Sequence, residues 1–446
     1  MIMHKERLAP VKLVLKGNPA LLNLKTKCFY TILAVLIVQA LGCIPSPFID
    51  HIYAKMVLGV DPALGFFNAM TGQGFSRLSM MTLSITPYIT ASIVLQLLAI
   101  VIKPLSDLLT DTSDSAKKKK WAVNIALSAF LAFTQGIAMA IGYGRQGIIT
   151  TYTWYSILIV TAFWTLGTAA AAGMGWFISA RLIGRGTLNG VSIILLANIL
   201  SSYAADAAQV YEAASFGRTA ASMAVRLAVV IGLVIAMFLL VTVGQLSEKR
   251  LRVQQSKRAS DTFNFAGTDF RIKLWPGSVV PVIFASQIYA IPAIIRSVTG
   301  SAWTWPNYFN SGAWFNPQSP IYTLGAIPYV ALIILFSYYY SEMSVNVKEV
   351  AENFKRHGYT LPGIRPGKPT EDYINRQMKY VIFIGGAALS VIAVVPCIVS
   401  GTMGISGLAF LGTSLLITVG VILEIRDYIA SQTKFSTRKL GGFLRA

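Results

Sequence analysis

Ten apolar stretches of roughly bilayer-spanning length follow one another along this chain of 446 residues. A transmembrane helix needs about 20 predominantly apolar residues. The composition agrees, because 54% of the residues are hydrophobic and only 13% are charged. The chain is therefore predicted to be an all-α polytopic membrane protein. Its predicted spans are residues 28–45, 80–102, 121–143, 152–178, 190–205, 222–246, 278–295, 321–340, 380–400 and 404–423.

The loops between these stretches alternate between rich and poor in Lys and Arg. Of the 38 Lys and Arg residues, 32 fall in segments on one side of the predicted membrane. Basic loops stay in the cytoplasm, so this asymmetry predicts that both termini are cytoplasmic. The net charge of +20 would also suit a nucleic-acid partner, but topogenic charge accounts for most of it.

Asp, Glu and His are nearly missing from the centres of the predicted spans, and the two acidic residues Asp206 and Glu424 lie at span ends. Ion-coupled transporters place such groups at the midplane, so a secondary transporter of small solutes is disfavoured. The chain has no P-loop or His-Glu-x-x-His motif, and Cys28, Cys43 and Cys397 show no paired spacing. The sequence therefore predicts no catalytic residue, metal site or cofactor, and it leaves a passive conduit or a receptor.

Two predicted cytoplasmic loops, 247–277 and 341–379, are longer than a connection requires and carry seven basic residues each. The first interleaves Leu and Val with cations, which favours a projecting hairpin. The second is predicted to continue the eighth span as an amphipathic helix to His357. It then turns at 362–367, where two prolines and two glycines hold Arg365. A rigidly displayed cation suits docking to a partner, and topogenic charge is the alternative.

A short helix is predicted in the segment from Asp61 to Gly74, on the side opposite the cytoplasm. Asp61 followed by Pro62 is typical of a helix start, and Gly72 and Gly74 are typical of its end. At 1.5 Å per residue, such a helix is too short to cross a core of about 30 Å. It would lie on the surface or fold back into the bundle as a re-entrant element.

Five segments resemble one family in the same order along the chain. The run from Gly74 to Leu98 closely resembles the second-span signature of the SecY family, the channel subunit of the Sec protein-export translocon. The other four segments are 188–194, 281–286, 361–367 and 412–417. The resemblance covers essentially the whole chain.

This resemblance implies ten helices in two pseudo-symmetric halves of five. The N-terminal half is 1–215, with spans 1–5 and a plug at about 61–77, and the C-terminal half is 216–446, with spans 6–10 and both long loops. An hourglass pore between the halves would conduct secretory proteins across the cytoplasmic membrane of a prokaryote and release membrane proteins laterally. The implied protein is a channel subunit without enzymatic activity.

The resemblance also implies residue roles, and it shifts the short helix from the surface to the re-entrant position. Ile85 and Ile89 share a helix face, and simple packing is the alternative for every ring position. An apolar ring would exclude water by dewetting. The implied pore ring is Ile85, Ile89, Leu195, Ile283 and Ile417, and the implied plug residues are Leu64, Phe67, Met70 and Arg77.

Partner docking is implied for six cations in the two long loops, which in the family bind the SecA motor ATPase or the phosphates of the ribosome. Other implied partners are SecE-like and SecG-like membrane subunits, signal sequences, unfolded polypeptides and lipid. Departures such as Arg252 for proline and Gln255 for tyrosine leave open an accessory SecY with restricted substrates. The implied docking residues are Lys249, Arg250, Arg252, Lys257, Arg258 and Arg365.

Overall fold

A computed structural model describes residues 24–58, 68, 70–111, 113–183, 189–215, 220–255, 269–275, 279–299, 305–345, 347–404 and 406–443. The chain divides into two compact units. The first unit contains residues 1–208, 293–304 and 421–446, and the second contains residues 209–292 and 305–420. The predicted halves, 1–215 and 216–446, remain a prediction.

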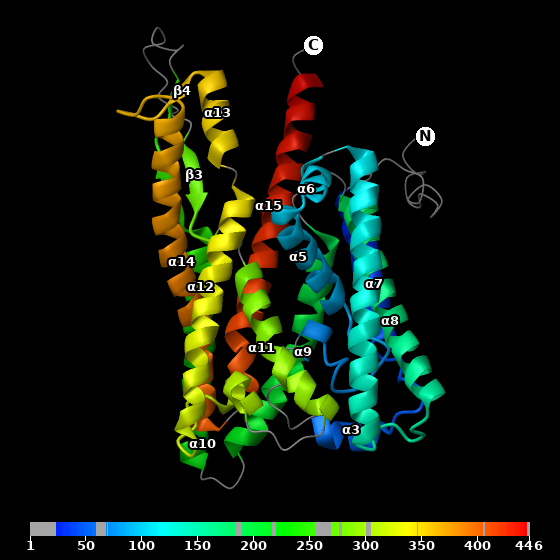
Figure 1. The fold of residues 1–446 in the computed structure, drawn as a ribbon. Coiled ribbons are helices and arrows are strands. Elements are labelled where there is room, and N and C mark those ends of the chain that lie inside the picture. The colour runs from blue at the N-terminus through cyan, green and yellow to red at the C-terminus, as the bar shows by residue number, and fades with distance from the viewer. Residues whose placement is uncertain are drawn as a thin grey trace, which may run out of the picture. The chain divides into compact units, whose positions relative to one another are not determined.

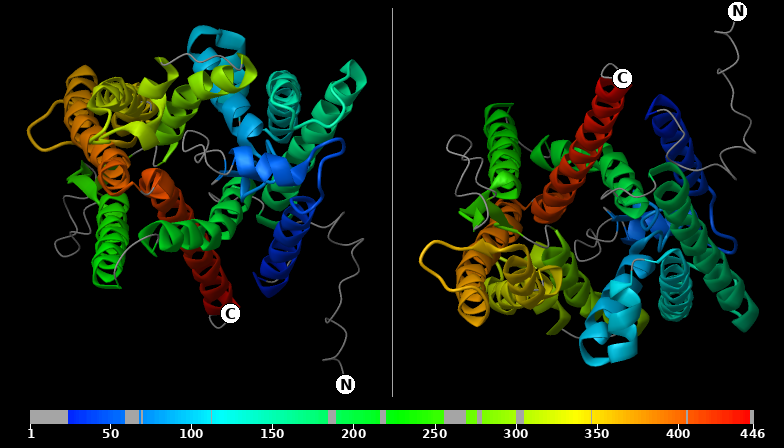
Figure 2. Two further views of the ribbon diagram at one scale, coloured as in Figure 1. Left: turned by 90° about the horizontal axis from the view of Figure 1, so that it is seen from below. Right: turned by 90° about the horizontal axis from the view of Figure 1, so that it is seen from above.

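The first unit is built around the helix pair α7 and α8, which run side by side (Figures 1 and 2). Trp164 of α8 is fully buried, meets Tyr143 of α7 edge-on and donates a hydrogen bond to Ser46 Oγ at 2.8 Å. An aromatic ring whose polar edge is satisfied in this way suits a buried position. The helices are α2 (Leu24–Leu41), α3 (His51–Leu58), α5 (Thr86–Val101), α6 (Lys103–Thr110), α7 (Asp114–Arg145), α8 (Trp154–Phe177), a π-helical turn (Ile178–Ile183) and α9 (Gly190–Ser215).

The second unit packs α12 against α14, and these two helices are neighbours in Figures 1 and 2. Its elements are α10 (Ala220–Leu246), β1 (Glu248–Leu251), β2 (Gln254–Gln255), β3 (Phe270–Lys273), α11 (Val280–Thr299), 3₁₀ turns at Trp305–Phe309, Ser311–Ala313 and Pro320–Gly325, α12 (Ala326–Ser344), α13 (Val347–His357), β4 (Tyr359–Thr360), α14 (Lys368–Met403), a 3₁₀ turn at Ser406–Phe410 and α15 (Leu411–Phe443). The two ends of α9, of α11 and of α15 fall in different units, because the boundaries between the units lie inside these helices.

A single tryptophan fills the space beside α10 and α14 in the second unit. Trp275 is buried and donates a hydrogen bond from Nε1 to the carbonyl oxygen of Gly385 at 2.9 Å. A Cβ atom at Gly244 of α10 would lie 1.9 Å from the Trp275 ring, and one at Gly385 of α14 would lie 2.3 Å from the Leu274 carbonyl oxygen. Both helices therefore need glycine where this aromatic ring and its backbone approach.

The all-helical polytopic prediction is confirmed. In the described part of the chain, seven helices are long and apolar enough to cross a membrane, namely α7, α8, α9, α10, α12, α14 and α15. Three shorter apolar helices, Thr26–Leu41, Thr86–Ala99 and Val280–Tyr289, coincide with the other three predicted stretches. The count of ten spans and the cytoplasmic position of both termini remain predictions.

Two boundaries differ from the sequence prediction. The second apolar stretch was expected to be helical from residue 80, but α5 begins only at Thr86. Ser84 has a positive φ of 44° and Pro87 lies in the first turn of α5, so the backbone before Thr86 cannot continue a helix. The amphipathic helix predicted to follow the eighth span is present as α13 and ends at His357 as expected, but it is not continuous with α12, because Val345 between them is extended.

We expect Gly167→Ala to destabilise the first unit, while Gly173→Ala on the same helix does not. A Cβ atom at Gly167 would lie 2.1 Å from the Met80 carbonyl oxygen, whereas one at Gly173 meets nothing within 4 Å. Overpacking against backbone costs about 2 kcal/mol. Thermal unfolding of the detergent-solubilised variants measures this difference, and equal midpoints for Gly167→Ala and the parent protein would contradict the packing of residue 80 on α8.

Candidate functional site

The segment of residues 70–85 is an irregular stretch buried inside the first unit. Met70 is only 1% exposed, and the helical turn that contains it ends at Gly72, which has a positive φ of 62°. This helix end agrees with the prediction from Gly72 and Gly74. The predicted plug residues Leu64 and Phe67 lie outside the described residues, so only Met70 and Arg77 of that set can be placed.

Apolar packing and backbone hydrogen bonds both hold this segment in place. Phe75, Leu78 and Leu83 belong to one buried cluster with residues of α7 and α8. The Met80 N–H donates to the carbonyl oxygen of Ile44 at 2.9 Å, next to the end of α2. Irregular backbone at membrane depth is tolerated where it is buried in protein. The first unit therefore gives the segment the protein environment that a re-entrant element requires.

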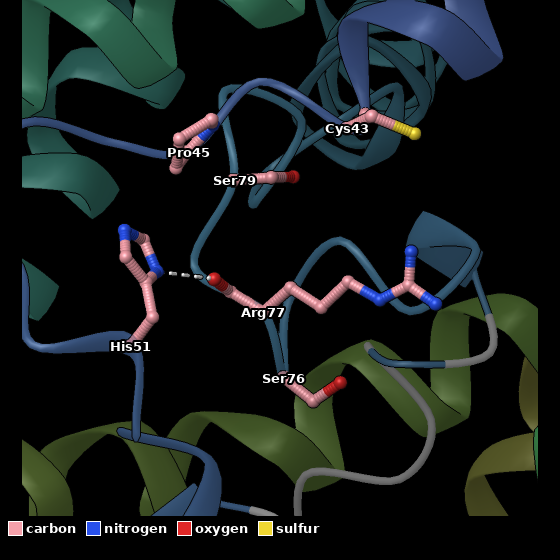
Figure 3. A pocket seen from close by; sticks show the side chains of 7 residues that line it. Cys43, Pro45, His51, Ser76, Arg77 and Ser79 are labelled. Carbon is pink, nitrogen blue, oxygen red and sulfur yellow. Dashed lines mark hydrogen bonds between the residues drawn. The ribbon is translucent and has the colours of Figure 1, made fainter. Parts of the chain in front are cut away.

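Arg77 lies at the edge of the segment, beside a hollow of about 280 Å³. Its carbonyl oxygen is 3.0 Å from Nδ1 of His51, and the other ring nitrogen of His51 is 3.3 Å from the carbonyl oxygen of Ser46. The Arg77 side chain is exposed and points away from His51 (Figure 3). The backbone of Arg77 is thus tied to α3, while its charge stays in contact with solvent.

The predicted ring residues are divided between the two units. Ile85 and Leu195 are buried and Ile89 is half-buried in the first unit. The Ile89 N–H bonds to the Ile85 carbonyl oxygen at 3.1 Å, so the two residues are one helical turn apart as expected. Ile283 and Ile417 are buried in the second unit. The ring itself remains a prediction.

The two long basic loops are joined into one folded body, which we call the loop body. It comprises residues 248–255, 269–275 and 347–382, and thus contains β1–β4, α13 and the first turns of α14. β1 pairs antiparallel with β3 at the other end of the first loop, whereas the predicted hairpin lay within residues 248–258, of which 256–258 lie outside the described residues. β2 of the first loop pairs with β4 of the second. A shared apolar core lies beneath them, formed by Leu251, Val253, Ile272, Val347, Leu361, Ile374, Met378, Val381 and Ile382.

Several predicted docking cations are exposed on this loop body. Arg252 is exposed, and Lys249 is hydrogen-bonded to Gln377 on α14. The Arg250 guanidinium pairs with Glu248 at 3.0 Å, and Arg271, which the sequence analysis did not single out, also reaches Glu248 at 3.5 Å. Exposed pairs of this kind contribute little stability. Two further predicted cations, Lys257 and Arg258, lie outside the described residues.

Arg365 is displayed by a tight turn on the same body. Pro362 and Gly363 occupy the two central positions of a type II turn, because Gly363 has φ 77° and the Ile364 N–H bonds to the Leu361 carbonyl oxygen at 3.0 Å. The carbonyl oxygen of Arg365 accepts a hydrogen bond from Oγ1 of the buried Thr370 at 2.9 Å.

The Arg365 side chain is exposed, and the described residues offer its guanidinium no hydrogen-bond or ion-pair partner. The backbone on either side of this cation is therefore held while its donors remain available to a ligand. Within the same described ranges, no group of three or more side chains is arranged to hold a metal ion.

These features define a polytopic helical membrane protein that carries a buried irregular segment in one unit and a basic body on the other. A family model described as SecY matches residues 79–426. The protein translocase subunit SecY of Thermotoga maritima is 31% identical over 95% of this chain and 95% of its own length. The SecY of Staphylococcus aureus strain NCTC 8325 is 31% identical over 94% of this chain and 96% of its own length. The chain belongs to the SecY family.

Solved structures show the same fold at low sequence identity. A protein-conducting channel structure matches with a TM-score of 0.62 and 16% identity, over 95% of this chain and 97% of that one. The Sec61 chain of a canine ribosome-channel complex from the endoplasmic reticulum matches with a TM-score of 0.60 and 16% identity, with the same coverage. The fold of this chain is therefore that of the SecY and Sec61 channels.

Proposed function

We propose that this chain is the protein-conducting subunit of a translocase in the cytoplasmic membrane. The observation that carries this proposal is its membership of the SecY family, with 31% identity to a protein translocase subunit over 95% of the chain. The family and the fold indicate a channel subunit and not an enzyme. The driving energy must then come from partners that dock on the cytoplasmic side.

The proposed seal consists of an apolar ring and a plug. Apolar side chains at a constriction exclude water and ions without making bonds that a passing polypeptide must break. The ring would comprise Ile85, Ile89, Leu195, Ile283 and Ile417. The plug would include Leu64, Phe67, Met70 and Arg77. Burial of Met70 within the first unit supports the re-entrant position over a surface helix.

The proposed docking surface is the loop body. Its exposed cations, including Arg252 and Arg365, could bind carboxylates of a motor ATPase such as SecA or the phosphates of ribosomal RNA. One structural neighbour is a ribosome-channel complex, which supports a ribosomal partner. SecE-like and SecG-like subunits are proposed to complete the complex in the bilayer, where signal sequences and unfolded polypeptides would be its substrates.

Depletion of the protein tests the function itself. A channel for secretory proteins predicts that unprocessed precursors accumulate in the cytoplasm as the protein disappears, which pulse-labelling and immunoprecipitation would measure. Accumulation of many precursors would indicate a general channel, whereas accumulation of one or a few would indicate an accessory one. If every precursor tested is processed at its normal rate, the proposal is wrong.

A further inference from the structure

A single buried amide joins the irregular segment to two helices of the first unit. Asn198 lies on α9 and is only 2% exposed. Its Nδ2 donates to the Met70 carbonyl oxygen at 3.0 Å and to Ser84 Oγ at 3.1 Å. Its Oδ1 accepts from Nε2 of Gln39, on α2, at 3.0 Å. Both amide hydrogens and the oxygen are therefore used, and the bonds reach both ends of the 70–85 segment.

A second contact places the same segment directly on the backbone of α9. Gly72 has φ 62°, and a Cβ atom there would lie 3.1 Å from Cα and 3.2 Å from the carbonyl oxygen of Asn198. No side chain separates the two backbones at this point. The position therefore favours glycine for its positive φ and for this close approach, independently of the hydrogen bonds made by the amide.

The contacts of Asn198 adjoin the residues proposed for the seal. Ser84 directly precedes Ile85 in the chain, and Asn198 follows Leu195 by three residues, so these two share a face of α9. Met70 belongs to the proposed plug. The amide thus connects the 70–85 segment with the neighbours of two proposed ring positions, Ile85 and Leu195. Hydrogen bonds between helices stabilise such a polar group inside a membrane protein.

We propose that Asn198 is the latch of the closed channel, a positioning residue whose side chain holds the 70–85 segment against α9. Its bonds to Met70 and Ser84 break when the segment moves. A hydrogen-bonded latch suits a reversible gate, because water entering the open channel replaces the lost partners. This inference rests on the proposed channel function and names how its closed state is held.

Variants of Asn198 test the latch through the stringency of the channel, by which we mean how strongly export depends on an intact signal sequence. Asn198→Leu removes all three bonds, and Asn198→Asp keeps the acceptor for Gln39 but loses both amide donors. Each should raise export of a reporter with a defective signal sequence by about tenfold, as expected for loss of a buried hydrogen bond. Ser202→Ala is the matched control, because Ser202 is equally buried on α9 but bonds to the Ile199 carbonyl oxygen within its own helix.

A reversible cross-link separates a latch from a merely structural role. A Cβ atom at position 72 would lie 3.4 Å from Cβ of Asn198, close to the separation of about 3.5 to 4.5 Å found in disulfides. In a protein whose Cys28, Cys43 and Cys397 are replaced by serine, the pair Gly72→Cys and Asn198→Cys should block export when oxidised. Reduction should restore export. Each single cysteine variant should respond to neither treatment.

The outcomes distinguish the latch from the function on which it rests. If the Asn198 variants and the oxidised pair export as the parent protein does, while Ile85→Asn relaxes stringency, the latch is overturned and the channel stands. If depletion leaves all precursors processed, the proposed channel function is wrong, and the latch proposal, which rests on it, is wrong as well. Relaxed stringency in Asn198→Leu and Asn198→Asp, normal stringency in Ser202→Ala and a redox-dependent block together establish the latch.

Discussion

Replacing Arg365 with lysine is expected to reduce translocation by roughly tenfold to a hundredfold, although the charge of the loop is unchanged. A guanidinium forms a bidentate fork with a carboxylate or phosphate that an ammonium group cannot reproduce. Hydrogen bonds to charged groups contribute about 1.5 to 3 kcal/mol, which sets this range. Translocation of a radiolabelled precursor into vesicles, with SecA or ribosomes supplied, is the measurement.

Arg356→Lys is the matched control for this experiment. Arg356 is also exposed on the loop body, where it makes a surface pair with Glu352 at 3.7 Å, and surface pairs of this kind contribute little. We expect normal translocation in this control. Normal translocation in Arg365→Lys as well, with normal assembly and topology, would show that Arg365 contributes only to the positive-inside bias.

The turn that presents Arg365 can be tested through Thr370. Thr370→Val removes the hydroxyl that donates to the Arg365 carbonyl oxygen, whereas Thr370→Ser keeps it. A neutral hydrogen bond contributes about 1 kcal/mol, so the valine variant should translocate about fivefold more slowly. The serine variant should match the parent protein. Equal rates in both variants would mean that the orientation of Arg365 does not depend on this bond.

Asparagine at a ring position is expected to raise export of a reporter with a defective signal sequence by fivefold to a hundredfold. A polar side chain at the constriction recruits water and stabilises the open channel by about 1 to 3 kcal/mol, the cost of burying an unpaired amide. The variants are Ile85→Asn, Ile283→Asn and Ile417→Asn. Export of the reporter is measured beside that of the same reporter with an intact signal.

Valine provides the control at each of these positions, because Ile85→Val, Ile283→Val and Ile417→Val keep the constriction apolar. These variants should retain the stringency of the parent protein. If none of the three asparagine variants relaxes stringency, these residues pack within their own units and do not form a ring.

Local sequence signals predicted local structure well. Pro362 and Gly363 predicted the turn that displays Arg365, and the structure contains a type II turn there. Gly72 predicted the end of the short helix, and its φ of 62° has that role. These predictions succeeded because proline fixes one φ angle and glycine permits another, so the signal and its effect lie within a few residues.

The apolar run before α5 shows that hydrophobicity along the sequence is not sufficient to predict the backbone conformation. Leu83 and Ile85 are buried, as their hydrophobicity predicts, but residues 80–85 are irregular and not helical. Hydrophobicity reports removal from water, and it does not distinguish a lipid-facing helix from a loop enclosed by protein. Burial against α7 and α8 determined this conformation, and it permits irregular backbone that lipid alone would not allow.

By itself, the sequence determined the membrane class, the predicted orientation and the residues that carry the family resemblance, because hydropathy and charge act through the composition of single segments. Only the tertiary structure joined the two basic loops through β2 and β4. It also brought Asn198 to Met70 and Ser84, which are 128 and 114 residues away in the chain. Such contacts depend on the packing of whole helices, so no local pattern of residues encodes them.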